Sequence, residues 1–494
     1  MRCIVIQSCM MAAVASFAGG FPLEKASCGV FSPDGRSVAF QQEQDGRLAV
    51  GVLRLDTGCV EWVEKGPGNA FHPAWTPDGG LVYACGHLTL SAYEARKRNS
   101  DEGYNIRLWK NGVKKDLTHG RWRDSTPSVS PDGRTVWFAT TRGAARPGLC
   151  VQGNNYMYSC PIEGGEATLR RTSPGERSGG GVSQPVQSPD GRFLAWAEVD
   201  VCGDVWHIMC ARVEDLDRAC RLTTTKMPSY APRWSPDGRR IVFTGCKAGD
   251  PGWCVYVMDV YAGTIGRVCE GREGAFSPDG RQIVYETTQG SLVLRPFEAD
   301  KVPWETLEEE SPFRDVSAEK VLWSAENVKP GGPAQPLPEG FNTSAKTLFV
   351  RARIAAGNRK IGFEHIFCGS FKEHSHAFQL YFEGKGLPYW ATRHSDGTFA
   401  GVSVKQLPKD FEGTMTGVRH GDMCIIKVDG QPAATSLAPN GLMQCLGPRT
   451  FTVGPVGGEG AASRPFKGRI DKLEIGVGWP SNLPLPPTRK EFFK

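Results

Sequence analysis

The chain has 494 residues, of which 40% are hydrophobic and 22% charged, and this composition excludes an intrinsically disordered protein. Glycine (60 residues) and proline (35 residues) are abundant, which favours many short strands joined by turns over long helices. The net charge of +5, without a block of Lys and Arg, argues against a nucleic acid partner. Because no apolar stretch reaches about 18 residues, we expect no membrane span.

The N-terminus has the pattern of an export signal. Arg2 supplies a positive charge, residues 4–15 form a short apolar run, and Ser16-Phe17-Ala18 provides small residues at the cleavage positions. We therefore expect residues 1–18 to be a signal peptide and the mature protein to be periplasmic, on the cell surface or secreted. The alternative is a buried N-terminal strand.

A repeated turn dominates the next 270 or so residues. A Pro-Asp-Gly tripeptide, preceded by Ser or Thr, occurs six times with proline-to-proline spacings of 44, 54, 58, 47 and 42 residues. The prolines are Pro33, Pro77, Pro131, Pro189, Pro236 and Pro278. Proline presets φ, Asp bonds nearby backbone, and Gly takes the positive φ that lets an antiparallel strand return.

A short apolar strand that ends in an aromatic residue follows each turn, as in Ile241-Val242-Phe243. A unit of about 45 residues with four strands has the size of one propeller blade. The six turns and their strands resemble the WD40-like repeats of TolB-type propellers. This resemblance implies an all-β fold with a six-bladed β-propeller over residues 28–300.

The pattern changes after the propeller. Residues 301–319 are predicted to be a solvated linker. Residues 320–480 then contain alternating strands, a strand that ends in Val428-Asp429-Gly430, and a closing Phe-x-Gly-x-Ile-Asp-x-Leu-x-Ile that starts at Phe466. This order resembles a laminin-G/concanavalin A-like jelly roll, which is a β-sandwich. Residues 481–494 are expected to form an exposed tail.

Polar residues near the start of each innermost propeller strand are candidate ligand contacts. In a TolB-type propeller the link that enters this strand lies at the mouth of the central channel, so the resemblance places these residues there. The candidates are His72, Arg123, Asp124, Gln184, Tyr230, Arg272 and Glu273. Their mixture of charge, amide and aromatic groups suits a polar ligand or a peptide, and the alternative is an ordinary polar loop surface.

The C-terminal part offers weaker candidates. Tyr389 and Trp390 could stack on sugar rings, although Trp390 suits a core equally well. His374 and His376 would share one face of a strand, but solvated imidazoles are the simpler interpretation, so we expect no metal.

We expect no cofactor either. Calcium in the C-terminal domain stays open, with Asp396 and Asp429 as candidates.

The cysteines agree with export. Sixteen are present, and removal of the signal would leave an even number, as suits an oxidising compartment. Cys246 and Cys254 flank a turn-rich loop between two strands and are predicted to form a disulfide. Cys210 and Cys220 span a hairpin of the fourth blade in the same way. Buried free thiols are the alternative.

The sequence contains no G-x-S-x-G, Walker A or HExxH motif. We therefore expect an exported, non-enzymatic binding protein whose partners are envelope or extracellular proteins, glycans or both. One alternative is a glycan-active lyase or hydrolase with its site in the propeller mouth or in the jelly-roll cleft. The other is a structural module of a surface assembly.

Overall fold

The computed structural model describes the chain in segments. They are residues 23–86, 103–120, 122–142, 156–171, 181–199, 205–224, 226–307, 316–341, 347–356, 363–371, 374–382, 386–393, 399–404, 407–408, 410–420, 423–431, 433–437, 449–453, 463–483 and 489–493. The signal peptide prediction lies outside them. No helix in these segments is long and apolar enough to cross a lipid bilayer.

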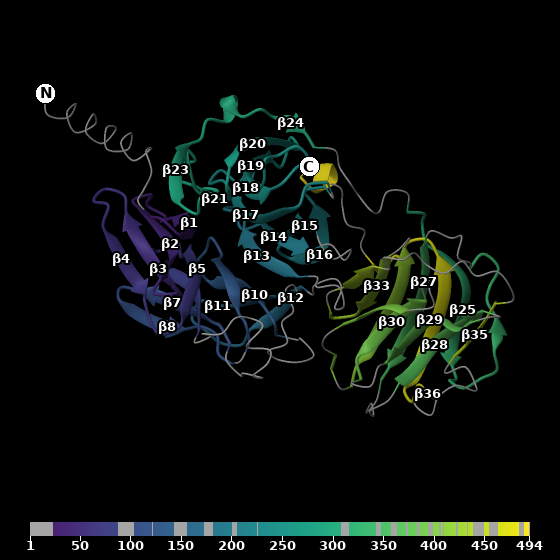
Figure 1. Cartoon of the computed structure of the whole chain (residues 1–494). Coiled ribbons are helices and arrows are strands. Elements are labelled where there is room, and N and C mark those ends of the chain that lie inside the picture. Colours follow the sequence, from purple (N-terminus) through teal and green to yellow (C-terminus); the bar gives the residue numbers. More distant parts are fainter. Residues whose placement is uncertain are drawn as a thin grey trace, which may run out of the picture.

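The N-terminal part consists of six antiparallel sheets, which we call blades 1 to 6 (Figure 1). Blade 1 contains β1 (Ala26–Phe31), β2 (Ser37–Gln44), β3 (Arg47–Arg54) and β4 (Val60–Glu64). Blade 2 contains β5 (Asn69–Trp75), β6 (Leu81–Gly86), β7 (Asn105–Lys110) and β8 (Val113–Asp116). Blade 3 contains β9 (Ser125–Val129), β10 (Thr135–Thr140), β11 (Tyr156–Pro161) and β12 (Thr168–Arg171).

The remaining blades depart slightly from four strands. Blade 4 contains β13 (Val182–Gln187), β14 (Phe193–Val199), β15 (Trp206–Arg212) and β16 (Asp215–Arg221). Blade 5 contains β17 (Ser229–Trp234), β18 (Arg240–Gly245), β19 (Cys254–Asp259), β20 (Thr264–Glu270) and the added β24 (Glu305–Thr306). Blade 6 contains β21 (Arg272–Phe276), β22 (Gln282–Glu286) and β23 (Leu292–Pro296), followed by the short helix η1 (Ala299–Lys301).

The blades close into a ring. The first strands of successive blades contact one another in the order β1, β5, β9, β13, β17 and β21, and β21 contacts β1 again. Residues before β1 strengthen this closure, since the Leu292 N–H donates to the Leu23 carbonyl at 3.4 Å and Glu24 bridges to Ser291. The predicted β-propeller is therefore confirmed.

The repeated turns work as the sequence indicates. In blade 5 the Ser235 hydroxyl donates to Asp237, and the backbone N–H groups of Arg239 and Arg240 donate to Asp237 and Ser235 at 3.0 and 2.8 Å. Gly238 has φ of 65°, and a Cβ built on it would lie 3.7 Å from Pro189 in the turn of blade 4. Glycine thus provides the turn conformation and close contact between neighbouring blades.

The C-terminal part contains two further sheets (Figure 1). The first is formed by β25 (Lys320–Val328), β37 (Arg469–Val477), β27 (Thr347–Ala355), β32 (Glu412–His420), β33 (Met423–Val428) and β34 (Ala434–Leu437). The second is formed by β26 (Gln335–Pro336), β35 (Arg449–Thr452), β28 (Phe363–Phe371), β29 (His374–Phe382), β30 (Pro388–Arg393) and β31 (Phe399–Ser403), and β36 (Ser463–Pro465) pairs with β28.

One apolar core joins these two sheets. Leu348, Val350 and Ile475 from the first sheet share a buried cluster with Phe367, Leu380 and other residues of the second sheet. The alternating strands of the sequence therefore bury one face of each sheet against the other. This arrangement is all-β, and its assignment to the jelly-roll class remains a prediction.

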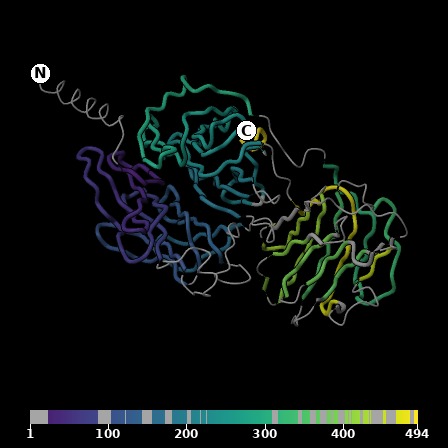
Figure 2. Tube along the Cα trace, in the orientation of Figure 1, coloured from purple at the N-terminus to yellow at the C-terminus, as the bar shows by residue number. Residues whose placement is uncertain are grey.

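The end of the chain returns to the propeller. The yellow C-terminal helix α3 (Arg489–Phe492) lies beside the teal strands of the propeller rather than beside the C-terminal sheets (Figure 2). Arg489 donates to the Val260 carbonyl at 3.0 Å, and Phe492 packs against Phe193 with ring centroids 5.4 Å apart. The prediction of an exposed tail is therefore wrong for these residues, because Phe492 belongs to the buried apolar cluster of blades 4 and 5 and Phe493 packs against it.

Candidate functional site

Each innermost propeller strand carries one non-glycine residue in the left-handed backbone region, five positions before the turn proline. The φ angles of these residues lie between 48° and 54°. They are Cys28, His72, Thr126, Gln184, Ala231 and Glu273, which we call the inner ring. Such a conformation costs of order 1–3 kcal/mol per residue and persists only where the surrounding structure imposes it.

A β-bulge in each innermost strand imposes this conformation. In blade 5, Tyr230 pairs with Thr244 whereas Arg233 pairs with Val242, so β17 contains one residue more than β18 over this stretch. The same shift occurs at the same place in the other five blades. A bulge changes the direction of the side chain at the extra residue. The propeller thus presents one redirected residue per blade around its axis.

Four polar side chains gather where blades 1, 2, 5 and 6 contribute to this region, and we call them the polar cluster: Cys28, His72, Arg233 and Glu273. The Cys28 thiol donates to Glu273 Oε2 at 2.6 Å, which joins blade 1 to blade 6. Arg233 follows the bulge of blade 5 and interacts electrostatically with the Glu273 carboxylate. His72 Nδ1 is buried and has no hydrogen-bond partner among the described residues.

Burial controls the protonation of the polar cluster. It lowers the pKa of His72 to about 4, so the imidazole is neutral near pH 7. It raises the pKa of the Cys28 thiol, and the nearby Glu273 carboxylate raises it further. Burial lowers the pKa of Arg233, and Glu273 opposes that effect. A neutral thiol is a poor nucleophile, so the cluster is suited to hydrogen bonding and charge recognition rather than to covalent catalysis.

The backbone of the inner ring is fixed by side chains of other strands. The Ala231 N–H donates to Gln184 Oε1 at 2.8 Å, and the Gln184 N–H donates to the Thr126 hydroxyl at 3.1 Å. These bonds tie blades 3, 4 and 5 together in sequence. Gln184, a predicted ligand contact, therefore has a structural role in holding adjacent blades.

Asp124 does not have the ligand-binding role that we predicted for it. Its carboxylate is fully buried and accepts hydrogen bonds from Arg142 Nε and Nη2 at 3.1 and 2.6 Å. Its own N–H donates to the Tyr104 carbonyl at 3.0 Å. These contacts occupy Asp124 within the propeller wall, which leaves it unsuited to contact a ligand.

The other candidates of the mouth are dispersed. Tyr230 lies one position before the inner ring and packs edge-to-face on Trp253, with ring centroids 5.1 Å apart. Arg272 is exposed one position before Glu273. Arg123 lies further upstream, and its Nε has no hydrogen-bond partner in the part of the chain that the structure describes. Of the seven predicted residues, His72 and Glu273 thus belong to the polar cluster.

Sequence reasoning missed Cys28 and Arg233. A constant count back from the turn proline would have found both, since inner-ring residues lie five positions before it and Arg233 lies three positions before it. The predicted residues instead lie one to three positions before the inner ring in blades 3 and 5, and none was predicted in blade 1.

Trp390 is a core residue and not a sugar contact. It has no exposed surface, packs against Phe378, and lies so close to Gly417 that a Cβ there would be 2.3 Å from the indole. Its neighbour Tyr389 points to the other face of the sheet, because successive strand residues alternate. The prediction is therefore corrected for Trp390 and stays open for Tyr389.

A row of aromatic rings crosses that other face. His365, Tyr381 and Tyr389 are partners on β28, β29 and β30, with ring centroids 5.0 and 5.2 Å apart. Tyr389 also covers Gly401 on β31, where an added Cβ would be 2.1 Å from the tyrosine ring. Glycine at this position allows the ring to lie against the sheet. Tyr381 is a residue that sequence reasoning missed.

The metal candidates receive little support. His374 and His376 lie on β29, but their side chains and all of Asp396 lie outside the described residues. Asp429 accepts the Thr414 N–H at 2.8 Å and precedes Gly430, whose φ is 71°, so it forms a hairpin turn. Within the described segments no three His, Cys, Asp or Glu residues converge as metal ligands would.

The Cys246–Cys254 bridge is not formed, and both thiols are free. The ladder of blade 5 pairs Cys254 with Gly245, so Cys246 is offset by one residue from its predicted partner. An offset of one residue places a side chain on the opposite face of a strand. The prediction is wrong because of this register.

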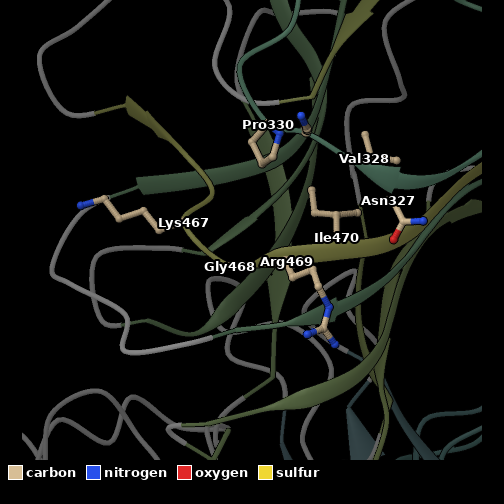
Figure 3. A pocket seen from close by; sticks show the side chains of 8 residues that line it. Asn327, Val328, Pro330, Lys467, Gly468, Arg469 and Ile470 are labelled. Atoms are coloured by element: carbon tan, nitrogen blue, oxygen red, sulfur yellow. The ribbon is translucent and has the colours of Figure 1, made fainter.

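The C-terminal part contains a hollow of about 410 Å³ between the end of β25 and the start of β37 (Figure 3). It is lined by Asn327, Val328, Lys329, Pro330, Lys467, Gly468, Arg469 and Ile470. The Lys467 and Arg469 side chains extend in different directions (Figure 3). Arg469 also pairs with Asp471 and Glu412, so the hollow does not focus its positive charge on one point.

No protein-family model matches the chain. It is 40% identical over 223 residues to the uncharacterized protein Atu1656 of Agrobacterium fabrum, which covers 43% of this chain and 67% of that protein. It is also 32% identical over 111 residues to the Protein TolB homolog of Chlorobium chlorochromatii, covering 22% of each chain. The propeller is therefore TolB-like.

The chain is also similar to solved propellers at lower sequence identity. The crystal structure of TolB from Acinetobacter baumannii is 18% identical, covers 61% of this chain and 71% of its own, and superposes with a TM-score of 0.39.

Proposed function

We propose that this chain, which belongs to the same family as the uncharacterized protein Atu1656 of Agrobacterium fabrum, is an exported binding protein. In this proposal the propeller recognises a peptide segment of an envelope or extracellular protein. The site we assign is the polar cluster with its surrounding inner ring. The non-enzymatic character, the export and the partner class are all parts of this proposal.

The polar cluster is the observation that carries the proposal. It combines a guanidinium, a carboxylate, a neutral imidazole and a thiol from four blades, with His72 Nδ1 lacking a hydrogen-bond partner among the described residues. A buried polar atom without a partner costs about 1–3 kcal/mol. A ligand that supplies a hydrogen bond to His72 and a charge to Arg233 or Glu273 would recover this cost. Peptides carry such groups at regular spacing.

Peptide selection tests this proposal. Phage-displayed peptides would be panned on the wild-type chain and on the Arg233→Gln variant, with Arg134→Gln as the control because Arg134 is an exposed arginine beside a Pro-Asp-Gly turn at the other end of an inner strand. We expect a family of peptides that binds wild type and the control but not Arg233→Gln. Enrichment that is equal on all three would count against the site.

The aromatic row favours a second binding function, namely glycan recognition by the C-terminal part. Tyr381 and Tyr389 are half-buried; His365 stacks on Tyr381, and Tyr389 lies tilted against it. Sugar rings stack on such aromatic faces. The order of strands resembles a laminin-G/concanavalin A-like jelly roll, which we propose as the class of this domain. A glycan array should show binding that Tyr389→Ala removes and that Tyr261→Ala, which removes an exposed tyrosine of the propeller, retains. Shortening of a bound glycan would instead support the enzyme alternative.

A further inference from the structure

Two cysteines of blade 4 lie directly opposite each other. Cys210 on β15 and Cys220 on β16 are partners in the antiparallel ladder. The Leu222 N–H donates to the Ile208 carbonyl at 2.8 Å, so the pair two positions along, Cys210 with Cys220, falls at the same kind of hydrogen-bonded position. Opposing Cα atoms at a hydrogen-bonded position are about 5.5 Å apart, which lies within the Cα range of disulfides. Their Cβ atoms are farther apart than at a non-hydrogen-bonded position, so the two strands must draw together locally for the bond to form.

Both side chains occupy the same face of the blade. Cys210 and Cys220 belong to one apolar cluster, with exposed fractions of 0% and 1%. Burial raises the pKa of Cys210, and the charge that Cys220 would carry as a thiolate raises it further, which indicates that the two sulfurs are neighbours. Neither forms a disulfide in the structure.

Other cysteines lack this arrangement. Cys246 is offset by one residue from Cys254, and Cys269 pairs with Val255 rather than with Cys254. Each of these offsets directs the two sulfurs to opposite faces. Among the cysteines of the described segments, Cys210 and Cys220 are the two that face each other across a ladder.

We propose that Cys210 and Cys220 are a disulfide-forming pair that becomes oxidised when the protein is exported. This inference uses the export that is part of the proposed function but not the ligand. The oxidant is a disulfide, carried by a thiol oxidase or by oxidised glutathione. One cysteine thiolate attacks the oxidant's disulfide, and the second cysteine displaces the oxidant sulfur. One S–S bond forms in blade 4, one breaks in the oxidant, and the oxidant leaves as two thiols with both protons.

The bond forms during folding. In the finished blade both thiols are excluded from solvent and the raised pKa of Cys210 keeps that thiol protonated, so an oxidant cannot reach them readily. While the β15–β16 hairpin is still open, both sulfurs are accessible. The cross-link then joins the two outer strands of blade 4 within the apolar cluster that also contains Phe492.

Peptide mapping of the exported wild-type chain tests the proposal without any variant. Free thiols would be blocked with N-ethylmaleimide under denaturing conditions, and the protein digested with trypsin without reduction. The expected product links the peptide of residues 193–212 to the peptide of residues 219–221. Because the longer peptide also contains Cys202, the Cys202→Ser variant is the matched control and should keep the link, whereas Cys210→Ser should lose it.

Reduction provides a second measurement. The denaturant midpoint of oxidised wild type should fall when dithiothreitol is added, and the midpoint of Cys220→Ser should be independent of dithiothreitol. Quantitative alkylation of both cysteines in exported protein, or a link of either one to another cysteine, would overturn the proposal. Alkylated cysteines in protein that keeps its signal peptide would show that export had failed, so processing at Ala18 should be verified by N-terminal sequencing of the same sample.

Discussion

Glycine and aspartate have separate roles in each Pro-Asp-Gly turn. The aspartate accepts a hydroxyl and a backbone N–H, and the glycine provides a positive φ. Four of these glycines also lie next to the proline of a neighbouring turn, namely Gly35, Gly133, Gly238 and Gly280. For Gly35 and Gly280 that proline lies within 3.4–3.6 Å of an added Cβ. These four turns therefore add contacts between neighbouring blades to those of the inner strands.

Replacement of one turn glycine should destabilise the propeller. Gly238→Val places a β-branched residue at φ of 65°, and we expect the free energy of unfolding to fall by about 1–3 kcal/mol. Urea denaturation followed by tryptophan fluorescence would measure this change. Gly332→Val is the control, because a Cβ at that glycine meets nothing within 4 Å and its φ is not positive. Equal stability of the two variants would contradict the turn assignment.

The turn aspartates should make the propeller sensitive to acid. A hydrogen bond from Lys110, followed by one from Thr76, lowers the pKa of Asp78 from 3.8 to about 2 in the folded chain. Because the folded value is the lower one, this stabilisation is complete above about pH 4 and is lost as pH falls toward 2. Asp78→Asn should show a weaker loss of stability over that window than wild type, whereas the exposed Asp45→Asn should behave as wild type. Parallel pH profiles for Asp78→Asn and wild type would contradict this.

Local sequence patterns predicted the strands and turns correctly, whereas the register between paired strands could not be predicted from them. The Pro-Asp-Gly spacing predicted a propeller over residues 28–300 because each turn and its strand are local. The failures concern offsets of one residue. Cys246 is next to Gly245, the residue that pairs with Cys254, and the buried Trp390 is next to Tyr389. Successive residues of a strand point to opposite faces, so each prediction failed by one position. Both Tyr389 and Trp390 are aromatic, so hydrophobicity alone could not show which one points inward.

The C-terminal helix is an element whose place depends on contacts distant in sequence, so no local pattern could predict it. Phe492 is buried against Phe193, and Arg489 donates to the carbonyls of Val260 and Tyr261 at 3.0 and 3.2 Å. A Cβ at Gly263 would lie 1.8 Å from the Arg489 guanidinium, so glycine makes room for this contact.

Loss of this contact should weaken blades 4 and 5. Phe492→Ala removes a buried aromatic ring, and we expect the propeller to lose about 2–3 kcal/mol of stability. Glu491→Ala, which changes an exposed residue of the same helix, should have little effect. Hydrogen exchange of the β15, β16 and β19 amides would measure the local change. Unchanged protection in Phe492→Ala would show that the helix does not contribute to these blades.

For the whole molecule, the two connections between the parts meet at one turn of blade 5. The Leu307 N–H, on the outgoing chain, donates to the Gly263 carbonyl at 3.0 Å, and Arg489, on the returning chain, contacts Val260 and Tyr261. The residues 301–319 that we predicted as a solvated linker thus begin with a stretch that packs on blade 5, where Lys247 also pairs with Glu305 at 2.6 Å. The C-terminal sheets are anchored to the propeller at both of their ends.

Removal of the returning anchor should release the C-terminal sheets. The covalent connection gives the tail a high local concentration at its contact surface on blades 4 and 5, so a small contact can hold it. Deletion of residues 489–494 should increase the radius of gyration from small-angle X-ray scattering and broaden the distribution of interatomic distances. Deletion of Lys494 alone should not. An unchanged scattering profile in the longer deletion would mean that other contacts fix the two parts.

The central claim is that the polar cluster of the propeller binds a peptide. Isothermal titration of one selected peptide into wild type and into Arg233→Gln tests it most directly, with Arg134→Gln as the control and with melting curves to verify that all three chains are folded. We expect Arg233→Gln to raise Kd by about thirty-fold or more, since truncating one partner of a buried charge contact costs about 2–5 kcal/mol. Arg134→Gln should leave Kd unchanged. Equal affinity of the peptide for wild type and for folded Arg233→Gln would contradict it.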